Sequence, residues 1–244
     1  MNTTKEKILQ NLVKLLPKAL VRYISAKSIE KETIGLNESY SQEGEDLVIN
    51  RFFGKRAPGF FVDIGAHHPY WYSNTYKFYK MGWCGINIDA LPGTKALFDK
   101  LRPNDINIET PISNYEDEEL VYYMFNDPAL NTFVEAEANL KDGLNHYRVI
   151  DKIKMKTQRL STILKEFLPL NVTIDFMSID VEGLDLQVLE SNDWELFRPK
   201  IILVEELRID FQNDGVSAVH DFLSKRNYKL FAKTINTSFF YCDI

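Results

Sequence analysis

In "GFFVDIGAHHPYWYSNT", residues 59–75, an apolar run ends in an acid and a single glycine turn, and this pattern indicates the class of fold. Residues 60–64 have the composition of a strand buried on both faces, as in a parallel sheet. Asp63, Gly65, His67 and His68 gather at its carboxyl end. Because ligands of open α/β sheets bind beyond the carboxyl ends of the strands, we expect a binding site there.

The rest of the chain continues the alternation of apolar strands and helical patterns. Two β-rich runs joined by a polar turn around Asn236 end it. This order predicts an α/β fold: a Rossmann-like, mostly parallel seven-stranded sheet with helices on both faces and a C-terminal antiparallel hairpin. Residues 119–160 are less regular and are expected to cap the ligand crevice. The further strand candidates are residues 85–88, 106–112, 176–179 and 201–204.

The chain divides by charge into a basic arm, residues 1–37, and an acidic body, residues 38–244. The arm holds seven Lys or Arg against three Glu, and residues 5–27 place apolar side chains at helical spacing. One interpretation is a helix that contacts an anionic membrane surface or a partner; the other is an ordinary N-terminal helix packed on the body.

Composition narrows the class of protein further. The net charge of −6 argues against a broad nucleic-acid footprint, which needs clustered Lys and Arg. Cys84 and Cys242 cannot form a disulfide framework, and no long uncharged apolar run marks a signal peptide or a membrane span. We therefore expect a cytoplasmic protein, associated with the inner membrane surface if the arm binds lipid.

The spacing around the first turn indicates the cofactor. Asp89 lies 24 residues beyond Gly65, where an acid accepts the hydroxyls of a ribose. A dinucleotide site needs several glycines to approach a pyrophosphate, whereas this turn has one. An acid before a single glycine favours S-adenosylmethionine, which is cationic and has no phosphate. An NAD-dependent oxidoreductase and a non-catalytic nucleotide-binding module with this fold remain the alternatives.

Three segments resemble the FkbM family of S-adenosylmethionine-dependent methyltransferases, in the branch with a Ser-Gln-x-Gly-Glu-Asp motif. They are "YSQEGEDLVI", "GFFVDIGAHHPYWYSNTYKFYKMGWCGINIDALPG" and "IDFMSIDVEGLDLQVLES...PKIILVEE", in the same order, and the resemblance covers about residues 39–235. It implies a class I methyltransferase fold. It also implies O-methylation of a sugar hydroxyl in a glycan, glycolipid or polysaccharide precursor, with a carbohydrate as the acceptor.

The resemblance also implies positions for the cofactor. Residues 60–66 would form its main motif, Asp89 would bind the ribose, and residues 109–114 would flank the adenine. The opening helix would approach the same crevice. The residues expected to bind S-adenosylmethionine are Gln42, Asp46, Asp63, Gly65, Ala66, His67, Ser73, Asn74, Asp89, Ala90, Ser113 and Asp180.

Methyl transfer to a hydroxyl needs a general base or a metal, because an alcohol has a very high pKa. His68, Asp180 and Glu182 are the catalytic candidates, although His68 could equally be a structural histidine satisfied by backbone or packed against the adenosine. Asp180, Glu205 and Glu206 could bind Mg²⁺, Mn²⁺ or Ca²⁺. Alternatively, Asp180 and Glu182 orient the methionine end and a helix N-terminus, while Glu205 pairs with a nearby base.

Overall fold

The computed structural model describes residues 16–20, 36–54, 56–206 and 217–242. The chain forms two compact units, residues 1–38 and residues 39–244. Most of the predicted amphipathic segment, residues 5–27, lies outside the described residues, so its membrane contact stays a prediction. Within the described part of the chain, every helix is too short or too polar to cross a bilayer.

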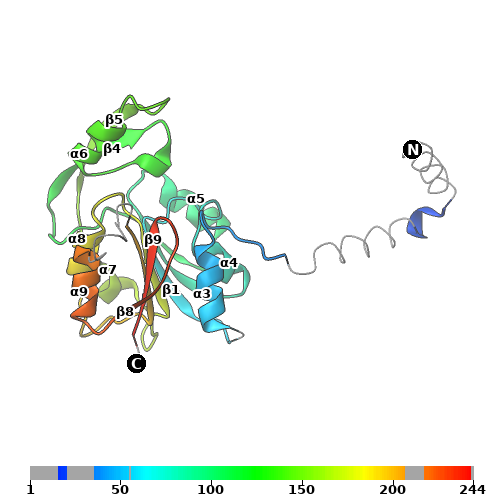
Figure 1. Ribbon diagram of the computed structural model, residues 1–244. Helices are drawn as coiled ribbons and strands as arrows, with labels where there is room; N and C mark the ends of the chain where they lie inside the picture. The colour runs from blue at the N-terminus through cyan, green and yellow to red at the C-terminus, as the bar shows by residue number, and fades with distance from the viewer. Residues whose placement is uncertain (1–15, 21–35, 55, 207–216, 243–244) are drawn as a thin grey trace. The chain divides into compact units, whose positions relative to one another are not determined.

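A seven-stranded sheet forms the centre of the second unit, in the order β3-β2-β1-β6-β7-β9-β8. The first five strands in this order are parallel, whereas β9 runs antiparallel to both β7 and β8. The predicted mostly parallel sheet with a C-terminal hairpin is therefore confirmed (Figure 1). Its strands are β1 (Phe60–Ile64), β2 (Cys84–Asp89), β3 (Ile106–Glu109), β6 (Phe176–Ile179), β7 (Ile201–Glu205), β8 (Lys229–Lys233) and β9 (Thr237–Tyr241).

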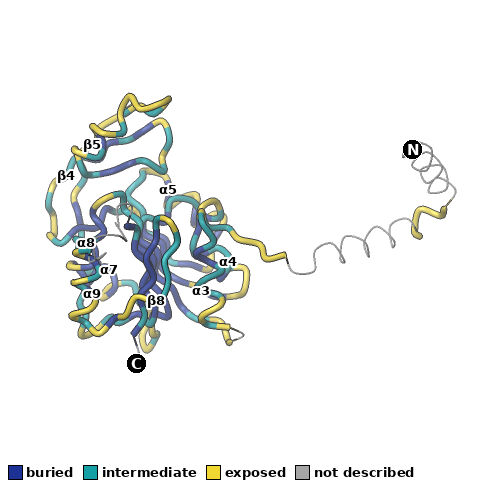
Figure 2. The backbone as a smooth tube through the Cα atoms, viewed as in Figure 1, coloured by how far each residue is buried: buried dark blue, intermediate teal, exposed yellow. Residues whose placement is uncertain are grey.

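Helices cover both faces of this sheet, and alternate strand residues pack against them. On one face, Val62 and Ile202 contact the core built by α7 (Leu160–Phe167), α8 (Asp185–Ser191) and α9 (Ala218–Ser224). On the other, Phe61 and Leu203 pack with residues of α3 (Glu45–Phe53) and α4 (Tyr76–Lys80). Figure 2 shows the resulting dark band of buried strands between partly exposed helices. A further helix, α5 (Thr94–Leu101), lies against β3.

The region that looks irregular in sequence forms a small antiparallel sheet of its own. In it, β4 (Glu119–Phe125) pairs with β5 (Val149–Lys156). Between these strands lie the short 3₁₀ helix η1 (Pro128–Leu130) and α6 (Glu135–Lys141). We call residues 119–156 the cap, because they lie beyond the end of the main sheet in Figure 1.

Local sequence explains the end of one strand and the start of one helix. The strand expected over residues 106–112 ends at Glu109, because Pro111 has no N–H to continue the ladder. The helix α4 begins at Tyr76, whose N–H donates a hydrogen bond to the Ser73 hydroxyl at 3.1 Å. Gly82 follows the helix with φ 88°, as expected of a helix-ending glycine.

Phe176 offers a test of this core, because its fully buried ring contacts Phe61, Phe78 and Trp83. Phe176→Ala should lower the free energy of unfolding by about 3–5 kcal/mol, through lost burial and an unfilled cavity. Urea denaturation measures the change. Leu230→Ala, at an exposed position of β8, is the control and should cost less than about 1 kcal/mol. Equal effects of the two substitutions would contradict the assigned core.

Candidate active site

A cavity of about 300 Å³ opens at the carboxyl ends of β1, β2, β6 and β7. The strand order reverses between β1 and β6, so the cavity lies at the topological switch point of the sheet. The cap closes it on another side with Tyr122, Leu130, Phe133 and Lys141. The prediction that the region around residues 119–160 caps the crevice therefore agrees with the residues that line it.

The glycine turn after β1 brings two strand ends into close contact. Gly65 has φ 78°, and a β-carbon built on it would lie 1.7 Å from the carbonyl oxygen of Asp180. The N–H groups of Gly65 and Ala66 both donate to the carbonyl oxygen of Ile88, at 2.9 and 3.1 Å. A side chain at Gly65 would therefore separate β1 from the end of β6, and glycine is required by both space and backbone conformation.

Asp89, at the end of β2, holds the loop that follows this turn. Its carboxylate accepts hydrogen bonds from the N–H groups of His67, at 2.7 Å, and Leu91, at 2.8 Å. Burial raises the pKa of the Asp89 carboxyl, while these two backbone donors oppose the rise. Asp89, Ala90 and His67 all line the cavity. Each carboxylate oxygen still has a lone pair with which to accept a ligand hydroxyl.

Asp63, on β1, is a second carboxyl group on the cavity wall. It is 4% exposed, and its Oδ2 accepts a hydrogen bond from the Thr75 hydroxyl at 2.9 Å. Burial raises the pKa of Asp63 to about 6, against the opposing effects of the Thr75 hydrogen bond and the Arg102 charge. Nearby, the Asn74 amide donates to the Ser178 hydroxyl at 3.0 Å, and both residues line the cavity.

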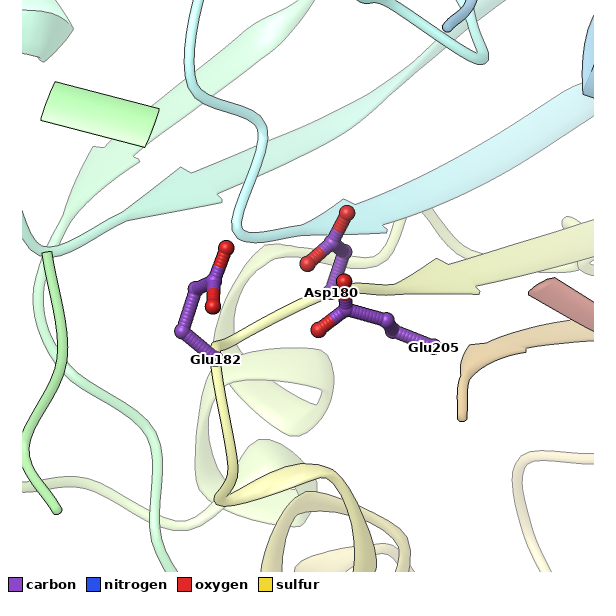
Figure 3. A group of neighbouring side chains, drawn as sticks. All are labelled: Asp180, Glu182 and Glu205. Carbon is purple, nitrogen blue, oxygen red and sulfur yellow. The ribbon is translucent and has the colours of Figure 1, made fainter. Parts of the chain in front are cut away.

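Three further carboxyl groups meet beyond the ends of β6 and β7. The three side chains of Asp180, Glu182 and Glu205 lie side by side (Figure 3). One carboxylate oxygen from each lies within 4.8 Å of the other two, and all three residues line the cavity. Burial, followed by the mutual repulsion of these groups, raises the pKa of Glu205 to about 10 and that of Asp180 well above its ordinary value. The Asp180–Glu205 pair therefore retains a proton at neutral pH.

A tight turn between β6 and α8 presents Glu182 to this group. Glu182 has φ 54°, a left-handed conformation that is uncommon for a residue with a side chain. The Asp185 carboxylate accepts from the N–H groups on either side, those of Val181 and Gly183, at 3.2 and 3.1 Å. From the cap, the Lys141 ammonium pairs with the Glu182 carboxylate at 2.6 Å. The turn and the cap thus fix this carboxylate together.

Residues of the opening motif "SQEGED" mostly form hydrogen bonds that hold neighbouring segments of the site in position. Gln42 lines the cavity. Glu43 accepts from the N–H of Asn236 at 2.9 Å, and Glu45 accepts from the Thr234 hydroxyl at 3.1 Å, so both hold the β8–β9 turn. Asn236 in that turn also lines the cavity. Asp46 is fully buried, where it accepts from the Ser39 hydroxyl and the Tyr40 N–H.

His68 lies outside the residues that line the cavity. Its Nδ1 accepts from the N–H groups of Tyr70, at 3.3 Å, and Trp71, at 3.2 Å, and its ring stacks on that of Trp71. Burial lowers the pKa of the imidazole. This arrangement resembles the structural alternative for His68, whose general-base role stays a prediction. Asp180 and Glu182 are the catalytic candidates that line the cavity.

Four other expected site residues also lie off the cavity wall. Asp46, Ser73 and Ser113 are buried and form hydrogen bonds within the protein, Ser113 with the Thr157 hydroxyl at 3.0 Å. Glu206, which follows the last residue of β7, is also buried and is not among the residues that line the cavity. The sequence predicts a metal-binding group of Asp180, Glu205 and Glu206, whereas in the structure the third carboxyl group beside Asp180 and Glu205 is that of Glu182.

Sequence reasoning missed the site residues that come from the cap, and it also missed Arg102. The cap was expected over the crevice, but the stretch "NDPALNTF" carries no motif that identifies particular residues. Arg102 is fully buried, whereas arginine is ordinarily exposed. Nothing in the sequence around it indicates that its side chain is buried. The cap residues on the cavity wall are Tyr122, Pro128, Ala129, Leu130, Asn131, Phe133 and Lys141.

These buried carboxyl groups predict a stability that falls as pH rises. The folded-state pKa is about 6 for Asp63, about 7 for Asp185 and about 10 for Glu205, each above the ordinary value. The folded chain therefore binds more protons than the unfolded chain from about pH 4 up to those values, and loses stability across that interval. The midpoint of thermal unfolding should be lower at about pH 8 than at about pH 5.5.

Glu205→Gln should reduce this difference between the two midpoints, because the amide does not titrate. Glu119→Gln is the matched control, since Glu119 is exposed and pairs with Lys154 on the surface of the cap. It should leave the difference unchanged. Midpoints that rise from pH 5.5 to pH 8 in the native sequence would contradict the assigned burial of these acids.

Comparison with known proteins identifies the family. No curated protein matches the chain. Among solved structures, a methyltransferase from Geobacter sulfurreducens aligns with a TM-score of 0.41 and 11% identity, over 97% of this chain and 96% of that one, a likeness too weak to carry a functional inference. A family profile described as "Methyltransferase FkbM domain" matches residues 63–230, well over half of the chain. The matched residues include the glycine turn, Asp89 and the three carboxyl groups beyond the ends of β6 and β7. This match shows that the chain belongs to the FkbM methyltransferase family.

Proposed function

We propose that this methyltransferase transfers the methyl group of S-adenosylmethionine to a hydroxyl oxygen of a carbohydrate acceptor, in a glycan, glycolipid or polysaccharide precursor. The observation that carries the proposal is the cavity at the switch point, which joins a single-glycine turn and Asp89 to the carboxyl groups of Asp180, Glu182 and Glu205. Family membership supplies the reaction class, and the cavity supports the cofactor and acceptor.

The cavity suits S-adenosylmethionine in charge. The cofactor carries an ammonium and a sulfonium, and it supplies an electrophilic methyl group when bound. The five carboxyl groups on the wall, those of Asp63, Asp89, Asp180, Glu182 and Glu205, outnumber the one ammonium that the described residues bring to it, that of Lys141. The wall therefore keeps a net negative charge even with one proton shared between Asp180 and Glu205. Asp89 would bind the ribose hydroxyls, and Thr110, Pro111 and Ile112 would flank the adenine. A dinucleotide pyrophosphate would instead meet several acids and one glycine.

The carboxyl groups beyond β6 and β7 can take up the proton that an acceptor hydroxyl loses. Because Nδ1 of His68 is occupied by backbone donors, we assign the general base to Asp180 or Glu182. Burial and the charges of neighbouring carboxyl groups raise the pKa of Asp180, which makes its carboxylate a stronger base than one in water. The cap and the turn at Glu182 would exclude water and orient the acceptor oxygen toward the methyl group.

A divalent cation at this group is a second proposal. Oxygens from Asp180, Glu182 and Glu205 are the ligand type that Mg²⁺, Mn²⁺ and Ca²⁺ prefer. Such an ion would acidify the acceptor hydroxyl. The ammonium of Lys141, already paired with Glu182, competes with it for one ligand.

The cavity mouth also supports a carbohydrate acceptor. Tyr72 lines the cavity with its side chain largely exposed, and the neighbouring Trp71 is exposed beside it. Aromatic faces suit the apolar faces of sugar rings. Gln42 and Asn236 line the same cavity, and each amide offers a donor and an acceptor to sugar hydroxyls.

Calorimetric titration of the purified protein with S-adenosylhomocysteine, with NAD as comparison, tests the proposed cofactor. We expect binding of S-adenosylhomocysteine with a Kd on the order of micromolar and no binding of NAD. Repeating the titration with Mg²⁺ tests the cation, since a bound ion would change the heat of binding. Binding of NAD alone would overturn the proposal in favour of an oxidoreductase.

Gly65→Ala should abolish or greatly weaken binding of S-adenosylhomocysteine, because the new β-carbon would displace the Asp180 carbonyl from the β1 turn. Gly93→Ala is the matched control. Gly93 also has a positive φ, 90°, but a β-carbon there would meet nothing within 4 Å. Both substitutions strain the backbone by about 1 kcal/mol, so a difference in affinity between them reports the contact with Asp180. Equal affinities would show that the turn does not shape the site.

A further inference from the structure

Arg102 is a fully buried cation at the end of α5, with 0% of its surface exposed. A charged side chain is seldom buried so completely unless it is paired, because the loss of hydration is costly. Its ion-pair partner is Asp105, which accepts from Nε of Arg102 at 2.7 Å. Asp105 pairs with one edge of the guanidinium, and the rings of Phe61, Tyr79 and Phe98 lie near it. The N–H groups of the other edge are buried as well and need acceptors of their own.

The second side of the guanidinium points toward the cavity wall. Nη1 of Arg102 donates to the Thr75 hydroxyl at 2.9 Å, and that hydroxyl donates to Oδ2 of Asp63 at 2.9 Å. The same Nη1 lies 3.4 Å from the carbonyl oxygen of Pro69, in the loop after the glycine turn. We call Arg102, Thr75 and Asp63 the buried relay. It joins the end of α5, the start of α4 and the β1 strand that lines the cavity.

The relay counteracts the effect of burial on Asp63. Burial raises the pKa of that carboxyl, whereas the Thr75 hydrogen bond and the Arg102 charge are the two largest influences that lower it. The Ser178 hydroxyl on β6 also lowers it, and the charge of Asp89 on β2 raises it. Asp180, beyond β6, faces Asp63 as a further acid. Arg102 is the cation among these neighbours, and its effect reaches Asp63 most directly through Thr75.

We propose that Arg102 is a positioning residue of the cofactor site: through Thr75 it keeps the Asp63 carboxylate ionised and directed into the cavity, where that carboxylate binds the ammonium of the cofactor. This inference rests on the proposed function, because it requires S-adenosylmethionine as the ligand. It assigns to Arg102 and Thr75 a role beyond packing, although neither of them lines the cavity.

The test compares two ligands over a range of pH. S-adenosylhomocysteine has the ammonium, whereas 5′-methylthioadenosine keeps the adenosine and the thioether but lacks the amino-acid end. Affinities are measured by calorimetry at about pH 6.5 and about pH 8.5, a range that lies above the pKa of about 6 for Asp63. The variants are Thr75→Val, which removes the hydroxyl at nearly constant volume, and Thr75→Ser, which restores it. Ser238→Ala removes another buried hydroxyl, one without a hydrogen-bond partner among the described residues, and is the control.

Thr75→Val should weaken S-adenosylhomocysteine about threefold at pH 6.5 and by less than about twofold at pH 8.5. A rise of about one unit in the pKa of Asp63, from about 6, lowers its ionised fraction from about three-quarters to about one-quarter at pH 6.5 and changes it little at pH 8.5. Its affinity for 5′-methylthioadenosine should change little at either pH. Thr75→Ser and Ser238→Ala should both bind the two ligands with the affinities of the native protein at each pH. Equal weakening of both ligands by Thr75→Val, or weakening that does not depend on pH, would overturn the proposal and leave a purely structural network.

Arg102→Lys provides the same test if Thr75→Val does not fold. Lysine retains a positive charge for Asp105, but it lacks the planar guanidinium that donates to Asp105 and Thr75 at once. Arg102→Lys should therefore also weaken S-adenosylhomocysteine more at pH 6.5 than at pH 8.5. Failure of the native protein to bind either ligand would overturn the proposed function itself. Binding of both ligands by the native protein, without the pH-dependent shift in either variant, would overturn only the relay.

Discussion

The contact between the Gly65 turn and the Asp180 carbonyl is the constraint on which the rest of the site depends. Two parallel strands, β1 and β6, can end side by side at the switch point only if the turn has no side chain there. With that contact made, Asp63, Asp89 and the grouped carboxyl groups face one cavity. A larger residue at position 65 would move the strand ends apart, and with them the acids from opposite halves of the sheet.

Bringing these strand ends together has an electrostatic cost, because it places several carboxyl groups near one another where they are largely buried and repel each other. The protein offsets this cost differently in two places. The ammonium of Lys141, from the cap, pairs with Glu182, and Arg102 acts on Asp63 through the Thr75 hydroxyl. Between Asp180 and Glu205, a shared proton reduces the repulsion between the two carboxyl groups. A cationic cofactor would complete the compensation, which gives a physical reason for a methyltransferase of this family to bind S-adenosylmethionine at such an acidic wall.

The fold was predictable from sequence because its signals are local. The apolar runs of β1 and β6 coincide with the expected strands, and the turn at Asn236 separates the expected hairpin strands. Where prediction failed, a longer-range interaction decided. The cap strands β4 and β5 pair across 23 intervening residues (126–148), so their register was not visible in either segment alone. For His68 the deciding contacts are local: its Nδ1 accepts from the N–H groups of Tyr70 and Trp71, two and three residues along the chain, and His68 is not among the residues that line the cavity.

The class of fold, the glycine turn with its acids and the family of the chain follow from composition and from spacing within short segments. Which acids lie together follows only from the folded chain. It placed Glu182 rather than Glu206 beside Asp180 and Glu205, brought Lys141 from the cap, and buried Arg102 behind Asp63. The physical reason is that side-chain direction and burial are set by packing between elements distant in sequence, and those two quantities govern which charges interact.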